Sequence, residues 1–255
     1  MRKIKLTLQY DGTDYSGWQV QAKGATIQGL IENALAEIAG SPTRLTGAGR
    51  TDAGVHAFAQ TAAFITISEH ETDVFLRALN AKLPDDIRVI SSEEVPEHFH
   101  PRYSAHDKTY SYLISHHGLY SVFLKRYSWH MSYTLNYDAM KEGAGYLMGE
   151  HDFSSFRASG CSSKHPVRKI IELNIEKLDS VDFMGFRFNV PLVKISMTAN
   201  AFLRHMVRNI VGTLVEIGRG KIPPEQMKTI LEARDRRAAG KTAPACGLFL
   251  ERICY

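Results

Sequence analysis

Hydrophobic and polar residues alternate with a period of two at the start of the chain. Ile4, Leu6 and Leu8 occupy every second position of "KIKLTLQY", with charged or polar residues between them. From Thr26 onward, hydrophobic residues recur at helical spacing as far as Gly40, a residue that favours a helix end. The pattern predicts a strand followed by an amphipathic helix.

Strands and helices continue to alternate along the first hundred residues. The pattern predicts a strand in "QTAAFITI", a helix in "DVFLRALNAKLP" that Pro84 ends, and a third strand in "IRVISSEEV". The next segment, "PEHFHPRYSA", combines two prolines with polar and aromatic residues. It is predicted to link two halves of the chain.

The second half repeats this order with different lengths. We predict strands in "KTYSYLISH", "VRKIIELNIEKL" and "FRFNVPLVKISM", and helices in "YDAMKEGAGYLMG" and "FLRHMVRNIVGTLVEIG". The predicted fold is mixed α/β, of the α+β kind, with two ferredoxin-like or RRM-like halves at 1–104 and 105–255. We expect one continuous, mainly antiparallel sheet, flanked by helices, to join the halves.

Composition indicates a folded protein without a membrane segment. Hydrophobic residues make up 44% and charged residues 23% of the 255 positions, the balance of a globular domain. The net charge of +4 permits nucleic-acid binding without arguing for it. Three cysteines without Cys-x-x-Cys spacing indicate a reducing compartment, and we expect a cytoplasmic protein. The N-terminal alternation indicates a strand and not a signal peptide.

The segment "GAGRTDAGVHAFAQ" carries the main candidate chemistry. Gly47, Gly49 and Gly54 surround Arg50 and Asp52. The segment does not match the glycine motif of a Rossmann loop or of a Walker loop, and a strand is predicted after it where those loops need a helix. An arginine beside an aspartate favours the ionised carboxylate, which in a desolvated cleft acts as a nucleophile or a base. The alternative is an Arg-Asp pair that only fixes a turn.

Two further arginines are predicted to lie on one face of the long helix. Arg204 and Arg208 are four residues apart, and residues at that spacing are neighbours on a helix surface. Two like charges repel there unless an anion compensates them, and a phosphate or Asp52 itself would do so. A solvated basic edge is the other interpretation.

Aromatic and basic residues occur together in three segments, a combination typical of RNA-binding surfaces. Aromatic residues are also common in cores, so this interpretation stays open. The segments are "YDGTDYSGWQVQ", "HFHPRYSAHDKTYSYL" and "HDFSSFRASGCSSKHPVRK". Two histidine pairs, His98 with His100 and His116 with His117, lack metal-ligand spacing, so no metal site is predicted.

Six segments in order resemble the tRNA pseudouridine synthase A family along essentially the whole chain. They are "YDGTDYSGWQVQ", "TGAGRTDAGVHAFAQ", "KTYSYLI", "HDFSSFRASGC", "FLRHMVRNIVG" and "TAPACGLFL". The resemblance implies an isomerase that converts uridine to pseudouridine at positions 38, 39 and 40 in the anticodon stem-loop of tRNA. It further implies a homodimer, two α/β halves sharing an antiparallel sheet, and no metal or cofactor.

The resemblance also implies roles for individual residues. Asp52 matches the essential nucleophile, and Tyr110 matches the tyrosine that stacks on the target base. Arg50 would orient phosphate and acid, Arg208 would contact the catalytic acid, and Leu248 would pack against the base. Whether Asp52 attacks C1′ of the ribose, attacks C6 of the base or removes a ribose proton stays open. A non-enzymatic RNA-binding module and a phosphosugar enzyme are the rival functions.

Overall fold

The computed structural model describes residues 1–116, 121–161, 163–183 and 185–255. The chain divides into two compact units, the first comprising Met1–Lys108 with Phe249–Tyr255 and the second Thr109–Leu248. The sequence prediction groups Phe249–Tyr255 with the second half. In the structure this segment belongs to the first unit because its strand pairs in parallel with a strand of that unit.

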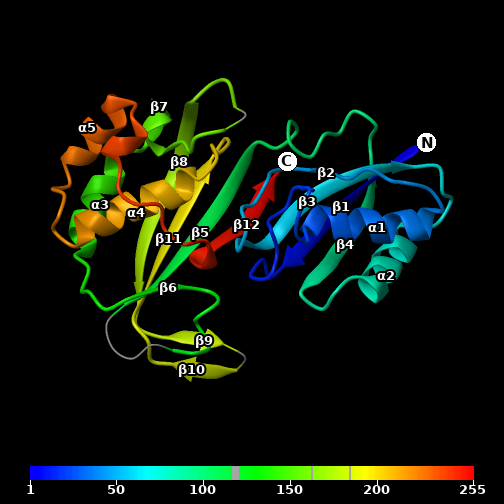
Figure 1. Cartoon of the computed structure of the whole chain (residues 1–255), viewed down its shortest axis with the longest axis horizontal. Helices are drawn as coiled ribbons and strands as arrows, with labels where there is room; N and C mark the ends of the chain where they lie inside the picture. Colours follow the sequence, from blue (N-terminus) through cyan, green and yellow to red (C-terminus); the bar gives the residue numbers. More distant parts are fainter. Residues whose placement is uncertain (117–120, 162, 184) are drawn as a thin grey trace. The chain divides into compact units, whose positions relative to one another are not determined.

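The first unit contains a four-stranded sheet in the order β4-β1-β3-β12, with a short strand β2 beside β3. Strand β1 lies antiparallel to both β3 and β4, whereas β12 lies parallel to β3. Helices α1 and α2 lie side by side in this unit (Figure 1). The elements are β1 (Arg2–Tyr10), α1 (Ile27–Ala39), β2 (Thr46–Gly47), β3 (His56–Thr66), α2 (Thr72–Lys82), β4 (Ile87–Val95) and β12 (Leu248–Cys254).

Local signals fix helix α1 at both ends, as the sequence predicts. The Thr26 hydroxyl accepts a hydrogen bond from the N–H of Gly29 at 3.3 Å, which satisfies a free donor of the first turn. Gly40 has a φ of 69°, in the left-handed region that ends helices. The predicted strand and helix at the start of the chain are confirmed.

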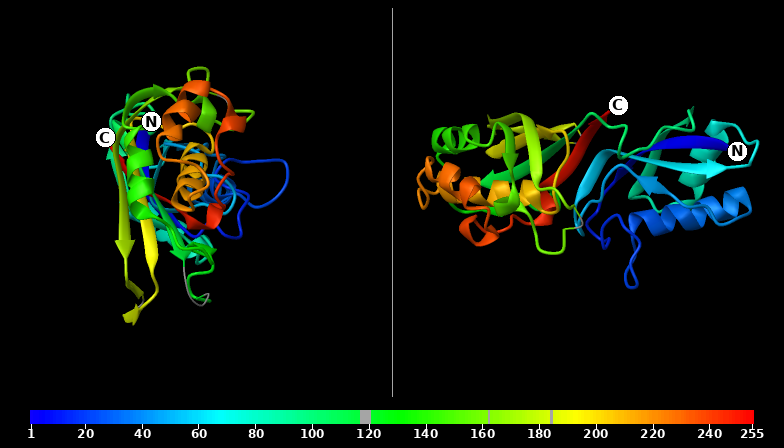
Figure 2. Two further views of the ribbon diagram at one scale, coloured as in Figure 1. Left: turned by 90° about the vertical axis from the view of Figure 1, so that its left-hand side faces the viewer. Right: turned by 90° about the horizontal axis from the view of Figure 1, so that it is seen from above.

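The core of the first unit lies between its sheet and its helices. Ile4, Leu6 and Leu8 of β1 are fully buried. The rings of Phe64 on β3 and Phe75 on α2 meet edge to face, with their centroids 5.2 Å apart. Figure 2, in the view from above, shows α1 along one side of these strands. The period-two pattern of β1 therefore identifies the face of the sheet that α1 and α2 cover.

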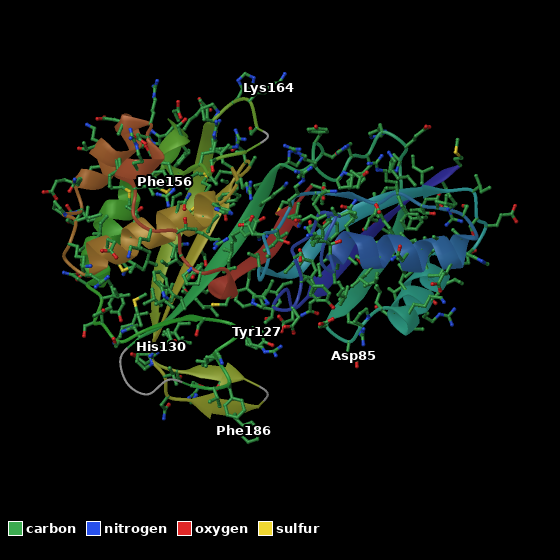
Figure 3. The ribbon with its side chains drawn as sticks, in the orientation of Figure 1. Asp85, Tyr127, His130, Phe156, Lys164 and Phe186 are labelled. Carbon is green, nitrogen blue, oxygen red and sulfur yellow. The ribbon has the colours of Figure 1, made fainter. Side chains whose placement is uncertain are left out.

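The strands of the second unit follow the order β5-β11-β8-β7, with β6 parallel to β5. Strands β9 and β10 form a separate hairpin, which carries the 69% exposed ring of Phe186 (Figure 3). The elements are β5 (Asp107–His116), β6 (Trp129–Met131), α3 (Tyr137–Gly145), β7 (Gly149–Asp152), β8 (Val167–Leu178), β9 (Val181–Phe183), β10 (Phe186–Phe188), β11 (Leu192–Ala199), α4 (Met206–Gly218) and α5 (Gln226–Ala233).

Two predicted elements of this unit differ in the structure. The strand expected over 186–197 is split into β10 and β11, with Pro191 in the gap, because proline has no N–H for a sheet ladder. The helix expected from Phe202 begins only at Met206. His205 has a φ of 60°, in the left-handed region, so the helical conformation does not extend back through it.

The segment predicted as a linker packs against the first unit. The Nζ atom of Lys3 donates to the carbonyl oxygen of Phe99 at 2.9 Å, and the Tyr255 hydroxyl donates to that of Pro101 at 2.9 Å. The rings of Phe99 and Tyr255 are 5.0 Å apart. Residues 96–105 therefore form part of the first unit and not a free connection.

The predicted fold class is confirmed. The strands form a mainly antiparallel sheet, and the described residues include five α-helices that flank it. A helix or strand is present at each place where a long periodic pattern predicts one, apart from the two corrections above.

Candidate active site

The loop between β2 and β3 carries Asp52. The three glycines around Asp52 differ in what a side chain at each position would contact. A Cβ atom on Gly47 would lie 2.7 Å from the ring of Trp18, and Gly54 has a φ of 77°. A Cβ on Gly49 would meet only the Nζ atom of Lys108, at an ordinary 3.6 Å. Packing and backbone conformation therefore require Gly47 and Gly54, whereas a Cβ on Gly49 would make only this ordinary contact.

The end of β1 and the segment after it contact the residues on both sides of Asp52. The hydroxyl groups of Tyr10 and Thr51 are hydrogen-bonded at 2.8 Å. A Cβ on Gly12 would lie only 2.0 Å from the carbonyl oxygen of Val55, so the two backbones are in direct contact. Because Thr51 precedes Asp52 and Val55 closes the turn, the carboxylate projects from a fixed stretch of backbone.

His56 anchors the end of this loop in the core. Its side chain is 2% exposed, and its Nδ1 atom lies 3.0 Å from the Asp11 carboxylate. The imidazole ring stacks on Phe249 of β12, with the centroids 4.7 Å apart. The loop is therefore held at its end by an acid from the segment after β1 and by a ring from the last strand.

Asp52 and Arg50 have different environments on the loop. Asp52 is half-buried, whereas Arg50 is exposed. The Nε atom of Arg50 donates to Oε1 of Gln19 at 3.0 Å, so the guanidinium is oriented by the segment between β1 and α1. This contact places Arg50 at the surface of the first unit.

Burial perturbs a tyrosine that supports this loop. Burial raises the pKa of Tyr10 to about 12, although hydrogen bonds from Thr51 and Gln60 act in the opposite direction. The phenol therefore stays protonated over the whole physiological range. Its role at the loop is that of a neutral hydrogen-bonding group.

Tyr110 lies on strand β5 of the second unit. Its side chain is only 8% exposed, and its ring meets that of Phe202 edge to face at 5.0 Å. The neighbouring Thr109 is hydrogen-bonded through its hydroxyl to Thr198 of β11 at 2.9 Å. Tyr110 is therefore positioned by a paired strand and by an aromatic neighbour.

Arg208 holds the segment that leads to Leu248. Its Nε atom donates to the carbonyl oxygen of Ala243 at 2.8 Å, and the N–H of Ala243 donates to the carbonyl oxygen of Arg208 at 3.0 Å. The Tyr112 hydroxyl on β5 donates to the carbonyl oxygen of Pro244 at 2.8 Å. Helix α4 and strand β5 thus fix the approach to Leu248, which is 5% exposed.

Arg204 does not share a helix face with Arg208. It precedes the left-handed residue His205, outside helix α4, and is exposed. Its Nη1 atom lies 3.4 Å from the carbonyl oxygen of Ser159, its hydrogen-bond acceptor. The argument from helical spacing is wrong because the helix begins two residues after Arg204.

Helix α4 carries a buried polar cluster around Asn209 that the sequence pattern does not predict. Asn209 is fully buried, and its Oδ1 atom accepts hydrogen bonds from Arg236 at 3.0 Å and from Thr242 at 2.7 Å. Its Nδ2 atom donates to the carbonyl oxygen of Phe156 at 2.8 Å. The available signal was an asparagine inside a strongly hydrophobic helix. The cluster fixes the segment before β12 to helix α4.

Two kinds of feature are absent from the described ranges of the chain. Within them, no group of three or more His, Cys, Asp or Glu side chains is placed to hold a metal ion. Nor is any helix there long and apolar enough to cross a membrane. Two residues of the segments singled out above, His117 and Ser162, lie outside the described residues.

Comparison with known proteins decides the family. The family model described as tRNA pseudouridine synthase matches residues 7–104 and 144–255, which is more than half of the chain. The chain belongs to the tRNA pseudouridine synthase family. The predicted resemblance is therefore confirmed, and as a member of this family the chain is an isomerase.

Relatives of the same family match along all or nearly all of their length. A protein of Acetivibrio thermocellus named tRNA pseudouridine synthase A is 44% identical over 255 residues, covering all of both chains. A Thermoanaerobacter protein of the same name is 42% identical with the same coverage. A third, from Coxiella burnetii, is 43% identical, covering all of this chain and 94% of the relative.

Membership in the tRNA pseudouridine synthase family argues against a non-enzymatic RNA-binding module and against a phosphosugar enzyme. The matched ranges include the Asp52 loop, helix α4 and the segment before Leu248. Tyr110 lies between the two matched ranges.

Proposed function

We propose that the chain isomerises uridine to pseudouridine in the anticodon stem-loop of tRNA, with Asp52 as the nucleophile. Full-length relatives named tRNA pseudouridine synthase A support the reaction. One observation about the loop supports the choice of residue. Asp52 is half-buried between Thr51, which is hydrogen-bonded to the last residue of β1, and Val55, which contacts the segment after β1. A carboxylate on a fixed backbone is the arrangement that nucleophilic catalysis needs.

The reaction breaks the glycosidic C–N bond, turns the base and joins C5 of the base to C1′ of the ribose. Three first steps are compatible with Asp52, namely attack on C1′, attack on C6 and removal of a ribose proton. Each step requires an ionised carboxylate within bonding reach of the nucleotide. C5 then loses its proton, and the Tyr110 hydroxyl is the proposed acceptor, directly or through a water molecule.

The target base must leave its stack before Asp52 reaches the sugar. Flipping costs a few kcal/mol, and stacking on an aromatic ring offsets about 1–3 kcal/mol of that cost. We assign the stacking to Tyr110 and the packing against the base to Leu248. Arg208 is assigned to the catalytic acid, while Arg50 and Arg204 are assigned to substrate phosphates. The exposed guanidinium groups of Arg50 and Arg204 support this assignment.

The Asp52→Asn variant tests the proposal. It keeps the size of the side chain and removes the negative charge, so we expect it to bind unmodified tRNA with nearly the affinity of the unmodified enzyme. We expect no tritium release from tRNA labelled at C5 of uridine. Appreciable release by a correctly folded variant would show that Asp52 is not the nucleophile.

Asp85→Asn is the matched control in the same unit. Asp85 lies on the exposed connection between α2 and β4 (Figure 3) and forms an ion pair with Arg88. Because a surface ion pair contributes little stability, this variant should release tritium at the unmodified rate. Equal loss in both variants would point to a general effect of charge and not to the loop.

We further propose that the chain acts as a homodimer in the cytoplasm. The family resemblance supports the dimer, and the three cysteines, none of them in a disulfide, support a reducing compartment. Sedimentation of the purified chain tests the dimer, and a monomer that is fully active at assay concentration would contradict it.

A further inference from the structure

Lys108 is a buried lysine in direct contact with the Asp52 loop. Its residue is only 8% exposed, and its Nζ atom donates to the carbonyl oxygen of Ala48 at 2.5 Å. Ala48 lies four positions before Asp52. Because an ammonium group has three donors and this bond uses one, two donors of Lys108 are left for other partners.

The charge of Lys108 is not compensated within the described part of the chain. No carboxylate there forms an ion pair with Lys108 or with Arg102, whose positive charge lies near it. The adjacent Asp107 forms no ion pair with Lys108 in the described residues. Burial and then the Asp107 carboxylate raise the pKa of the Cys254 thiol, and the Oδ1 atom of that carboxylate is buried without a hydrogen-bond partner. Burial, together with the charge of Arg102, lowers the pKa of Lys108 to about 8. Two neighbouring cations without a carboxylate between them repel each other, so binding of an anion there is favourable.

Gly49 leaves a path to the ammonium group. A Cβ atom on Gly49 would lie 3.6 Å from the Nζ atom of Lys108, and no atom of another described residue beyond its chain neighbours would lie within 4 Å of it. The space that a Cβ on Gly49 would occupy therefore adjoins the ammonium group of Lys108, and no side chain at position 49 stands between them. This space lies on the same loop as Asp52.

Aromatic neighbours indicate which kind of anion fits. Tyr103 is 75% exposed, with the Arg102 guanidinium 5.6 Å from the centre of its ring. An exposed ring beside the Arg102 guanidinium suits a nucleotide, because the cation can bind its phosphate and the ring can stack on its base. A phosphate with a nucleotide attached fits these groups better than a carboxylate does.

We propose that Lys108 and Arg102 form a phosphate subsite that binds a backbone phosphate of the tRNA beside the Asp52 loop. The inference rests on the proposed function for its substrate. The bound phosphate accepts hydrogen bonds from the two other donors of Lys108, while the third donor keeps its bond to the carbonyl oxygen of Ala48. Binding of the RNA backbone is thereby connected to the loop that carries Asp52.

The salt dependence of tRNA binding tests the subsite. We compare the dissociation constant of unmodified tRNA over a range of KCl concentrations for the unmodified enzyme, Lys108→Met and Lys108→Arg. Methionine removes the charge and keeps an apolar stem. Loss of one phosphate contact should raise Kd about tenfold and lower the slope of log Kd against log salt by about 0.7–0.9. Lys108→Arg should retain most of the slope.

Lys3→Met is the matched control. Lys3 belongs to the same unit and also donates to backbone carbonyls, those of Glu97 and Phe99. For Lys3→Met, the plot of log Kd for tRNA against log salt concentration should have the same slope as for the unmodified enzyme. A parallel line for Lys108→Met, even with a lower melting temperature or turnover, would show a purely structural lysine and overturn the proposal.

Gly49→Ala provides a second test should Lys108→Met fail to fold. The added methyl group makes only ordinary contact with Nζ, so the fold should persist while the path narrows. A reduced salt slope supports the subsite, and an unchanged slope with unchanged Kd overturns it.

Inorganic phosphate separates an RNA phosphate from a free one. At matched ionic strength, phosphate should raise the melting temperature of the unmodified enzyme above its value in chloride, and Lys108→Met should lose that difference. A phosphate effect without any change in the tRNA slope would show a free-anion site and overturn the RNA assignment. The unmodified enzyme could release no tritium while Lys108→Met still lowers the slope of log Kd against log salt. That result would contradict the proposed reaction and support the phosphate subsite.

Discussion

The segment before β12 lies close to helix α4 at Gly212. A Cβ atom at this position would be 1.7 Å from the carbonyl oxygen of Lys241, whereas real Cβ atoms essentially never lie within 3.0 Å of another heavy atom. Gly212→Ala therefore forces the backbone at Lys241 away from the helix by at least about 1.3 Å. We predict that this substitution destabilises the second unit.

The magnitude follows from the hydrogen bonds that such a shift breaks. Two bonds join Arg208 and Ala243, at 2.8 and 3.0 Å, and a third joins the N–H of Gly240 to the Thr213 hydroxyl at 2.9 Å. At about 1 kcal/mol each, their loss costs about 3 kcal/mol. The gain in helix propensity from glycine to alanine offsets about 1 kcal/mol. The net destabilisation is about 2 kcal/mol, which lowers the melting temperature by about 4–8 °C.

Thermal unfolding followed by circular dichroism measures this effect, with Gly145→Ala as the matched control. Gly145 is also a helical glycine, but a Cβ on it would have no described atom within 4 Å. Alanine there should leave the melting temperature equal or slightly higher. If Gly212→Ala were as stable as Gly145→Ala, the close approach of Lys241 to α4 would not contribute to stability and the reasoning would be refuted.

Two further predictions concern the Asp52 loop. Tyr10→Phe leaves the buried Thr51 hydroxyl without its 2.8 Å partner, so we expect about 1–2 kcal/mol less stability in urea unfolding and a lower kcat with little change in KM; an unchanged kcat would show that this bond does not position Asp52. The pKa of Lys108 is about 8 in the folded chain and about 10.4 in an unfolded one, so between pH 8 and 10 the unfolded state binds more protons and the free energy of unfolding rises with pH. The difference in stability between the unmodified enzyme and Lys108→Met should follow that rise, and a difference independent of pH would contradict it.

Periodicity predicts elements well where the signal is local. Helix α1 is the clearest case because Thr26 and Gly40 supply its end signals within the same segment. The start of α4 is the opposite case. The hydrophobic pattern runs back through Leu203, which is buried, but the left-handed conformation of His205 leaves no trace in that pattern. Burial alone does not distinguish a helical turn from the irregular turn before it.

Contacts between distant parts of the chain lie beyond sequence patterns. The hydrogen bond from Tyr10 to Thr51 spans 41 positions, and that from Thr242 to Asn209 spans 33. Each residue in these pairs is unremarkable by itself, since a tyrosine ending a strand or an asparagine in a helix has many uses. The pairing of β12 with β3 is also long-range, and it assigns the end of the chain to the first unit.

The three glycines around Asp52 show what a motif leaves undetermined. The sequence does not distinguish them, but a side chain on Gly47 would clash with Trp18, Gly54 adopts a positive φ, and a Cβ on Gly49 would make only an ordinary contact with Lys108. The first two therefore build the loop, because a side chain on either would disturb it. A Cβ on the third would meet Lys108, a residue that the motif does not contain and that lies 56 positions beyond Asp52. The motif by itself therefore does not show which cation the loop contacts, because that contact depends on how a distant part of the chain folds back.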